Sequence, residues 1–162
     1  MRQVVIAAGI FAVVLIGAPS MAHAQSARYG AVLTGSGESP AVVTAAFGDF
    51  TMDVDITSGR ADFVLRLWNV PAAVTGAHIH LGVGGANGPV IYNLNPPGFS
   101  GDVQLRGSIN LVSGLSPQPT RGLVDVRDVL QILEAHPEML YVNVHTTPNP
   151  GGEIRGQLQR NP

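Results

Sequence analysis

Hydrophobic and polar residues alternate along much of the chain with a period of two, the pattern of β-strands that bury one face and expose the other. The clearest run is 48–56, whose apolar positions are Phe50, Met52, Val54 and Ile56. A tight turn at Ser58-Gly59 follows, and 61–68 resumes the alternation with the apolar set Phe63, Leu65 and Leu67. Two alternating runs joined by such a turn predict an antiparallel hairpin.

Further short strands are expected between glycine- and proline-rich turns, at 29–34, 75–81, 89–94, 103–111, 140–146 and 154–158. One helix is expected, with Asp125 as its N-cap and an apolar face of Val126, Val129, Leu130 and Leu133. Regularly spaced short strands predict an all-β fold. We expect an antiparallel Greek-key sandwich or barrel with one short helix in a connection.

The first 24 residues have the pattern of a secretory signal peptide. Arg2 supplies a positive start, a nearly continuous apolar segment follows, and 22–24 match a small-residue cleavage site. We predict cleavage after Ala24, a single domain over 25–162, and a secreted or periplasmic location. A retained membrane anchor is the less favoured alternative, because the apolar run is shorter than the roughly 20 residues of a spanning helix. The mature chain is therefore expected to have no membrane span.

Charge and cysteine content narrow the classes of partner. Loss of Arg2 leaves eight arginines, no lysine and eleven acids, a net charge near −3. Without a basic run, nucleic acid is not an expected partner. The chain has no cysteine, so it offers neither disulfides nor thiolate metal ligands. No hydrolase or phosphate-binding motif appears, and we assign no catalytic residue.

Candidate chemistry lies in the strands expected at 75–81 and 140–146. A period of two places His78 and His80 on one face, about 7 Å apart. His145 lies on the outward face of the second strand. If the two strands pair, the three imidazoles share one surface.

Two interpretations of this cluster stay open at this point. Neutral imidazoles bind copper or zinc, and in an exported chain without cysteine copper is at least as plausible as zinc. The sequence therefore predicts a metal site at His78, His80 and His145, with copper the first cofactor to consider. In the equally weighted alternative, the three histidines donate hydrogen bonds to loop carbonyls and hold the glycine-rich turns.

Three further polar residues are candidates for a second shell around such a metal. Asn143 shares the outward face with His145, and Glu153 and Arg155 lie on one face of the last strand. Arg155 would orient an anion beside the metal. The structural alternative is a cross-strand ion pair between Glu153 and Arg155 on the sheet surface.

Several separated motifs span nearly all of the mature chain: Leu33-Thr34-Gly35, Glu38-Ser39-Pro40, residues 77–82 (AHIHLG), 87–90 (NGPV), 141–146 (YVNVHT) and 149–158 (NPGGEIRGQL). Together they resemble the CHRD domain, the module of chordins. That resemblance implies an extracellular role, growth-factor antagonism in animals and a secreted protein of undefined role in bacteria. It also implies an immunoglobulin-like barrel similar to copper-zinc superoxide dismutase.

Within that implied fold, His78-Ile79-His80 resembles the His-x-His copper strand of the dismutase. Residues 142–145 are similar to the later strand that supplies another copper-ligand histidine. The bridging histidine, the zinc ligands and the cysteines of that enzyme have no counterpart here. The resemblance therefore implies at most a single-metal site and not dismutation by the two-metal mechanism.

Two functions follow as hypotheses. The first is a secreted CHRD-type interaction module with an extracellular or envelope protein partner. The second is a mononuclear copper or zinc protein that uses His78, His80 and His145 for metal storage, delivery or redox chemistry. An enzymatic function is the less favoured expectation, and the oligomeric state stays open.

Overall fold

The computed structural model describes residues 26–94, 98–113 and 126–161. The predicted signal peptide at 1–24 and the predicted helix N-cap Asp125 lie outside the described residues. Within the described ranges, no helix has both the length and the hydropathy needed to cross a membrane.

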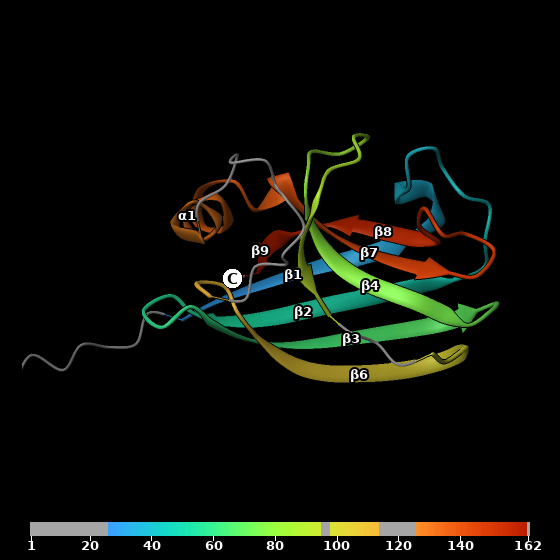
Figure 1. Ribbon diagram of the computed structural model, residues 1–162, viewed down its shortest axis with the longest axis horizontal. Helices are drawn as coiled ribbons and strands as arrows, with labels where there is room; N and C mark the ends of the chain where they lie inside the picture. The colour runs from blue at the N-terminus through green and yellow to red at the C-terminus, as the bar shows by residue number, and fades with distance from the viewer. Residues whose placement is uncertain (1–25, 95–97, 114–125, 162) are drawn as a thin grey trace, which may run out of the picture.

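Nine strands and one α-helix form the described chain (Figure 1). The strands are β1 (Ser26–Thr34), β2 (Phe47–Asp55), β3 (Arg60–Val70), β4 (Val74–Leu81), β5 (Val90–Asn93), β6 (Gly101–Asn110), β7 (Leu140–Thr146), β8 (Ile154–Gln157) and β9 (Gln159–Asn161). The helices are α1 (Val126–Ala135) and the short 3-10 turns η1 (Gly35–Gly37) and η2 (Pro137–Met139). Every strand expected from the alternation has a counterpart within a few residues.

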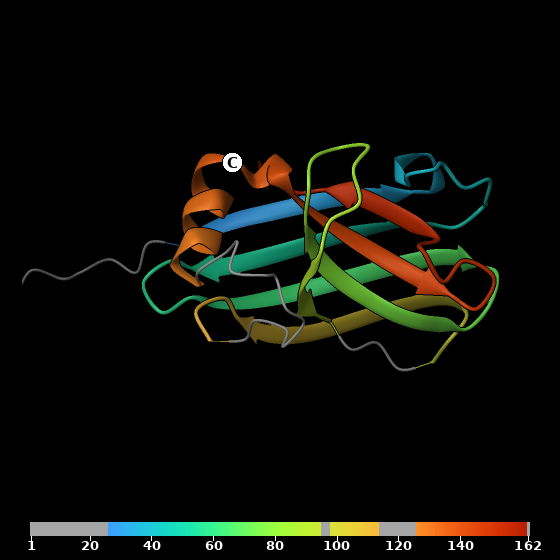
Figure 2. The same cartoon turned by 45° about the horizontal axis from the view of Figure 1, so that its top comes forward.

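All strand pairs are antiparallel, and the strands follow the order β5-β4-β7-β8-β1-β2-β3-β6. The chain leaves β3 for β4 on the far side of the sheet and returns to pair β6 with β3, which is a Greek-key crossover. The sheet curls into a nearly closed barrel (Figure 2). The predicted all-β antiparallel Greek-key fold with one helix is therefore confirmed.

The predicted hairpin is β2 and β3, in register from Phe47 opposite Trp68 to Val54 opposite Ala61. Its predicted apolar faces turn inward, and Phe50 stacks on Phe63 with 5.8 Å between ring centroids. Side chains from β4, β7 and β8 close the core from the other wall: Ile79, Val142, Val144 and Ile154, each no more than 1% exposed. Alternation thus located the core correctly, because each strand has one face toward the barrel interior.

The predicted last strand at 154–158 corresponds to β8, and the structure adds a further short strand, β9, after it. β8 pairs with β7, whereas β9 pairs with β1. Leu158 lies between them, fully buried, and its backbone N–H donates to the carbonyl of Leu140 at 2.8 Å. The interruption at Leu158 allows the chain to pair first with β7, through β8, and then with β1, through β9.

Two connections cover the outer face of β4, β7 and β8. The loop at 82–89 rises above this face in Figure 2. Ser39 Oγ donates to the carbonyl of Gly85 at 2.9 Å, and Asn87 Nδ2 donates to the carbonyl of Ser39 at 2.8 Å. These bonds join the 82–89 loop to the connection after η1. Side chains that point away from the barrel interior are consequently enclosed between sheet and loops.

Candidate metal centre

Strand register brings the three candidate histidines together. β4 and β7 pair so that Gly76 faces His145 and His80 faces Tyr141. His78 lies between these pairs on the same face and is therefore a diagonal neighbour of His145. A Cβ atom at Gly76 would lie 2.9 Å from Cε1 of His78. The glycine thus leaves room for the His78 ring to lean toward His145.

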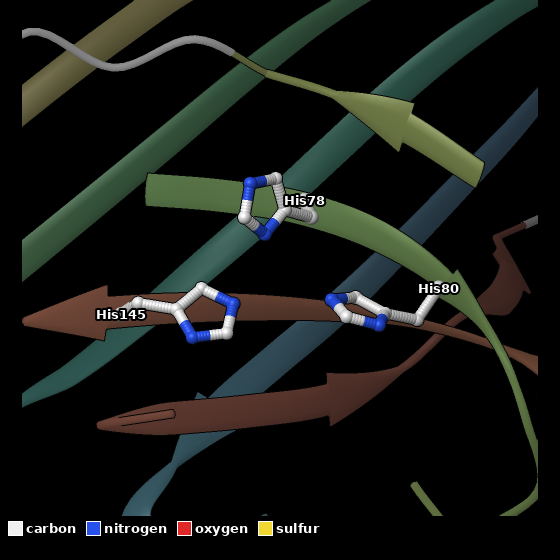
Figure 3. A group of neighbouring side chains, drawn as sticks. All are labelled: His78, His80 and His145. Atoms are coloured by element: carbon white, nitrogen blue, oxygen red, sulfur yellow. The ribbon is translucent and has the colours of Figure 1, made fainter. Parts of the chain in front are cut away.

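The three rings point at one another (Figure 3). One nitrogen from each of His78, His80 and His145 lies within 4.8 Å of one from each of the others. The ring centroids are 4.8 Å apart for His78 and His145, 5.6 Å for His78 and His80, and 6.0 Å for His80 and His145. The predicted grouping of three imidazoles on one surface is what the strand pairing produces.

Loop carbonyls anchor two of the rings. Nδ1 of His80 lies 2.9 Å from the carbonyl oxygen of Gly88, and Nδ1 of His145 lies 3.0 Å from that of Pro150. Because a carbonyl can only accept, each Nδ1 carries the proton and each Nε2 keeps a lone pair. The structural interpretation is therefore right about these two contacts, and both contacts leave Nε2 with a free lone pair.

Three ring nitrogens are buried without a hydrogen-bond partner among the described residues: Nδ1 of His78, Nε2 of His80 and Nε2 of His145. Leaving a buried polar atom unpaired costs about 1–3 kcal/mol. In Figure 3 one nitrogen of each ring faces the space between the three rings. A single bound cation would satisfy all three lone pairs at once.

The rings are neutral at physiological pH. Burial lowers the pKa of His78 to about 4, and the neighbouring rings of His145 and His80 act in the same direction. Burial also lowers the pKa of His80 to about 4, with the Gly88 carbonyl opposing and His145 adding to the effect. Burial lowers the pKa of His145 against the opposing carbonyl of Pro150. Metal ligation requires this neutral form of imidazole.

The spacing of the nitrogens suits one ion. Copper and zinc bind imidazole nitrogen at about 2.0–2.1 Å, so three nitrogens spread evenly around one ion are about 3.5 Å apart. The three nitrogens here lie within 4.8 Å of one another, so each ring has to move inward to bind one ion.

Asn143, a predicted second-shell residue, lies opposite His78 in the β4–β7 register and is 3% exposed. Its Nδ2 donates to both carboxylate oxygens of Glu38, at 3.0 and 3.1 Å. Its Oδ1 is buried without a hydrogen-bond partner. The outward face of β7 is thus not a wet surface but the floor of a buried polar cluster.

Glu38 is the member of this cluster that the sequence pattern did not reveal. Burial raises the pKa of its carboxyl to about 7, and the charge of Arg155 and the bond from Asn143 partly offset this effect. Gly152 has a φ of +142°, and a Cβ there would lie 2.5 Å from Glu38 Oε1. Glu38 follows a turn with no strand periodicity, so only its place in the Glu38-Ser39-Pro40 motif marked it.

The predicted ion pair between Glu153 and Arg155 is wrong, since neither bonds to the other within the described chain. Both side chains are 1% exposed. Glu153 accepts hydrogen bonds from the hydroxyls of Thr44 and Thr146 and from Nδ2 of Asn149. These donors lower the pKa of Glu153 despite its burial. Glu153 therefore holds the turn after β7.

Arg155 binds neutral acceptors around the 82–89 loop. Its guanidinium donates to Oε1 of Gln157, Oδ1 of Asn87 and the carbonyl of Val83, the last at 2.9 Å. The guanidinium carbon lies 3.4 Å from the ring centroid of Tyr141, which stacks on His80 with 4.7 Å between centroids. Arg155 thus fixes the loop that anchors His80, with Tyr141 between the cation and the histidine.

Comparison with known proteins gives one family. Neither the curated proteins nor the solved structures contain a match to this chain. The CHRD domain matches residues 29–158, which include the three histidines, Glu38 and Arg155. Because this match covers most of the sequence, the chain belongs to the CHRD domain family.

Proposed function

We propose that this CHRD domain is an extracellular-type binding module that holds one copper or zinc ion through His78, His80 and His145. One observation carries the proposal: three neutral, buried imidazole nitrogens without hydrogen-bond partners lie within 4.8 Å of one another. Unpaired buried nitrogens on three residues from two strands are costly for a merely structural cluster. A metal ion offsets that cost.

The surrounding residues suit such a role. The carbonyls of Gly88 and Pro150 fix the tautomers of His80 and His145, which is the usual outer-shell support of a ligating histidine. Nδ1 of His78 has no hydrogen-bond partner among the described residues, and the ring occupies the space left by the missing side chain of Gly76. His80 and His145 are therefore held in place without the metal, and His78 would move to complete the site when the metal binds.

The family and the predicted signal peptide both support the proposal that the protein is exported. CHRD domains are typically extracellular. The predicted signal peptide at 1–24, with cleavage after Ala24, adds a route of export to the periplasm or beyond.

Thermal melting with added metal tests the proposal. An ion at 100 times its dissociation constant adds about 2.7 kcal/mol to stability, which raises the melting temperature by several degrees. His80→Ala and His145→Ala abolish this rise. His136→Ala is the matched control, because the side chain of His136 is exposed and contacts Glu138, with Nδ1 3.2 Å from Oε1. Unchanged melting with Cu(I), Cu(II) and Zn(II) would contradict metal binding.

A protein partner is a second candidate function, favoured by an exposed apolar group at one end of the barrel. Phe47 and Trp68 stack with 5.1 Å between ring centroids, and Phe47 is 43% exposed. Val32 is 74% exposed and lies diagonally across the β1–β2 pair from Phe47. Pull-downs with wild type and Phe47→Ser test this candidate, and recovery of only the free chain in both cases counts against it.

A further inference from the structure

Charge around the three histidines is unbalanced. The ligands themselves are neutral, and no carboxylate in the described chain bonds to any of the three rings. Glu38 bonds Asn143 instead, and Glu153 bonds the turn after β7. An ion bound by His78, His80 and His145 therefore keeps its full charge inside the protein.

Arg155 adds a positive charge behind the site. Its guanidinium is buried, bonds only neutral acceptors and packs against Tyr141, which in turn packs against His80. The guanidinium carbon lies 3.4 Å from the Tyr141 ring centroid, and that ring stacks on His80 with 4.7 Å between centroids, so the cation is separated from the ligand ring only by Tyr141. Glu38 compensates only in part, because its carboxylate is bonded to Asn143 and burial raises its pKa, which disfavours the charged form.

Resting on the proposed metal-binding function, we infer that the site selects the monovalent ion Cu(I) over Cu(II) and Zn(II), and that the buried charge of Arg155 sets this preference. The cost of burying an ion rises with the square of its charge, so a divalent ion is penalised more than a monovalent one. Repulsion by Arg155 also doubles for a doubly charged ion.

The number of ligands that the protein supplies also favours Cu(I) over the divalent ions. Cu(I) is stable with three nitrogen ligands, whereas Zn(II) held by three histidines adds a water as its fourth ligand and Cu(II) prefers a tetragonal set. The three unpartnered nitrogens have almost no solvent contact, which restricts a water as fourth ligand. Asn143 Oδ1 is the buried oxygen on the same face, and its amide is held by Glu38. The set therefore matches Cu(I) more closely than either divalent ion.

Competitive titration of the full-length folded chain tests this inference. Cu(I) is measured anaerobically against bicinchoninate, and Cu(II) and Zn(II) against nitrilotriacetate. We expect a dissociation constant for Cu(I) at least 100-fold below that for Zn(II). Zn(II) or Cu(II) bound as tightly as Cu(I) overturns the inference and leaves metal binding intact, whereas no binding of any ion overturns the proposed function itself.

Variants of Arg155 test the electrostatic part. Arg155→Gln removes the charge, and we expect the Cu(I)-over-Cu(II) preference to fall about tenfold, equivalent to a drop of about 59 mV in reduction potential. Arg155→Lys retains the charge and should retain the preference. Arg66→Gln, on the outer sheet surface beside Asp49, is the control for a change of net charge alone.

An equal loss of affinity for all three ions in Arg155→Gln would mean that Arg155 only holds the loop, and this result overturns its electrostatic role. Arg155→Met keeps packing against Tyr141 and replaces Arg155→Gln if that variant does not fold. The comparison of ions on the wild-type chain decides the preference for Cu(I) independently of every variant.

Discussion

His80 donates a hydrogen bond from Nδ1 to the carbonyl oxygen of Gly88 at 2.9 Å while its Nε2 remains buried and unpaired. The same ring therefore fulfils the structural role expected of a loop-holding histidine and keeps a lone pair for a metal. The two interpretations of the histidine cluster thus concern different nitrogens, and each can be tested separately.

Without metal, we expect His80→Ala to destabilise the protein more than His78→Ala. His80 loses its bond to Gly88 and its stacking on Tyr141, which together are worth about 1–3 kcal/mol. His78→Ala removes a buried nitrogen that has no partner, so part of its packing loss is offset. Urea unfolding of both metal-free variants measures the order, and a larger loss for His78→Ala would contradict it.

The metal-free protein should be most stable near pH 6.5. His78 and His80 have folded pKa values of about 4, below the unfolded value of 6.5, so their contribution is lost as the pH falls from 6.5 toward 4. Glu38 acts oppositely: its folded pKa of about 7 exceeds the unfolded 4.5, so its contribution is lost as the pH rises through 7. Below pH 6.5 the two histidines outweigh the one acid.

Unfolding of wild type and Glu38→Gln across pH 4–8.5 provides the measurement. In Glu38→Gln, stability should no longer decrease above pH 6.5. It should still decrease as the pH falls below 6.5. A wild-type stability that falls steadily from pH 4 to 6.5 would show that the histidines are not buried as neutral rings.

Metal binding should persist well below the usual pKa of histidine. Protons compete for free rings only near their folded pKa, which is about 4 for His78 and His80. Calorimetric titration with Zn(II) at pH 7 and pH 5.5 should give dissociation constants within a few-fold of each other. A steep loss of affinity with a midpoint near pH 6.5 would indicate solvent-exposed ligands instead.

Gly76→Ala should lower the metal affinity although Gly76 is not itself a ligand. The added Cβ would lie 2.9 Å from Cε1 of His78 and 3.8 Å from Cδ2 of His145. Displacement of the His78 ring is expected to reduce metal affinity by about tenfold, with a stability cost of about 1–3 kcal/mol from overcrowding. Gly84→Ala is the control, since no atom lies within 4 Å of a Cβ there. Equal affinities for the two variants would show that His78 is not a ligand.

The local pattern of the sequence by itself determined the strands and their inward faces. Phe50, Met52 and Val54 had to share one side of a strand, and His78 and His80 had to share another, because successive side chains of an extended chain alternate in direction. The small connection helix was also expected from that pattern, whereas the pairing of the strands containing His80 and His145 was only a condition that the structure then met.

Only the tertiary structure decided what covers the outer face. Polar residues such as Asn143 and Arg155 sit at positions that alternation marks as outward, yet they are 3% and 1% exposed because the loop at 82–89 and the connection after η1 close over them. The position of Glu38 beside Asn143, 105 residues away in the chain, depends on that closure. Alternation describes only which side of a strand a residue occupies. Whether that side meets water is set by contacts between segments distant in sequence, and at this site those contacts bury His80 and leave His78 and His145 half-buried.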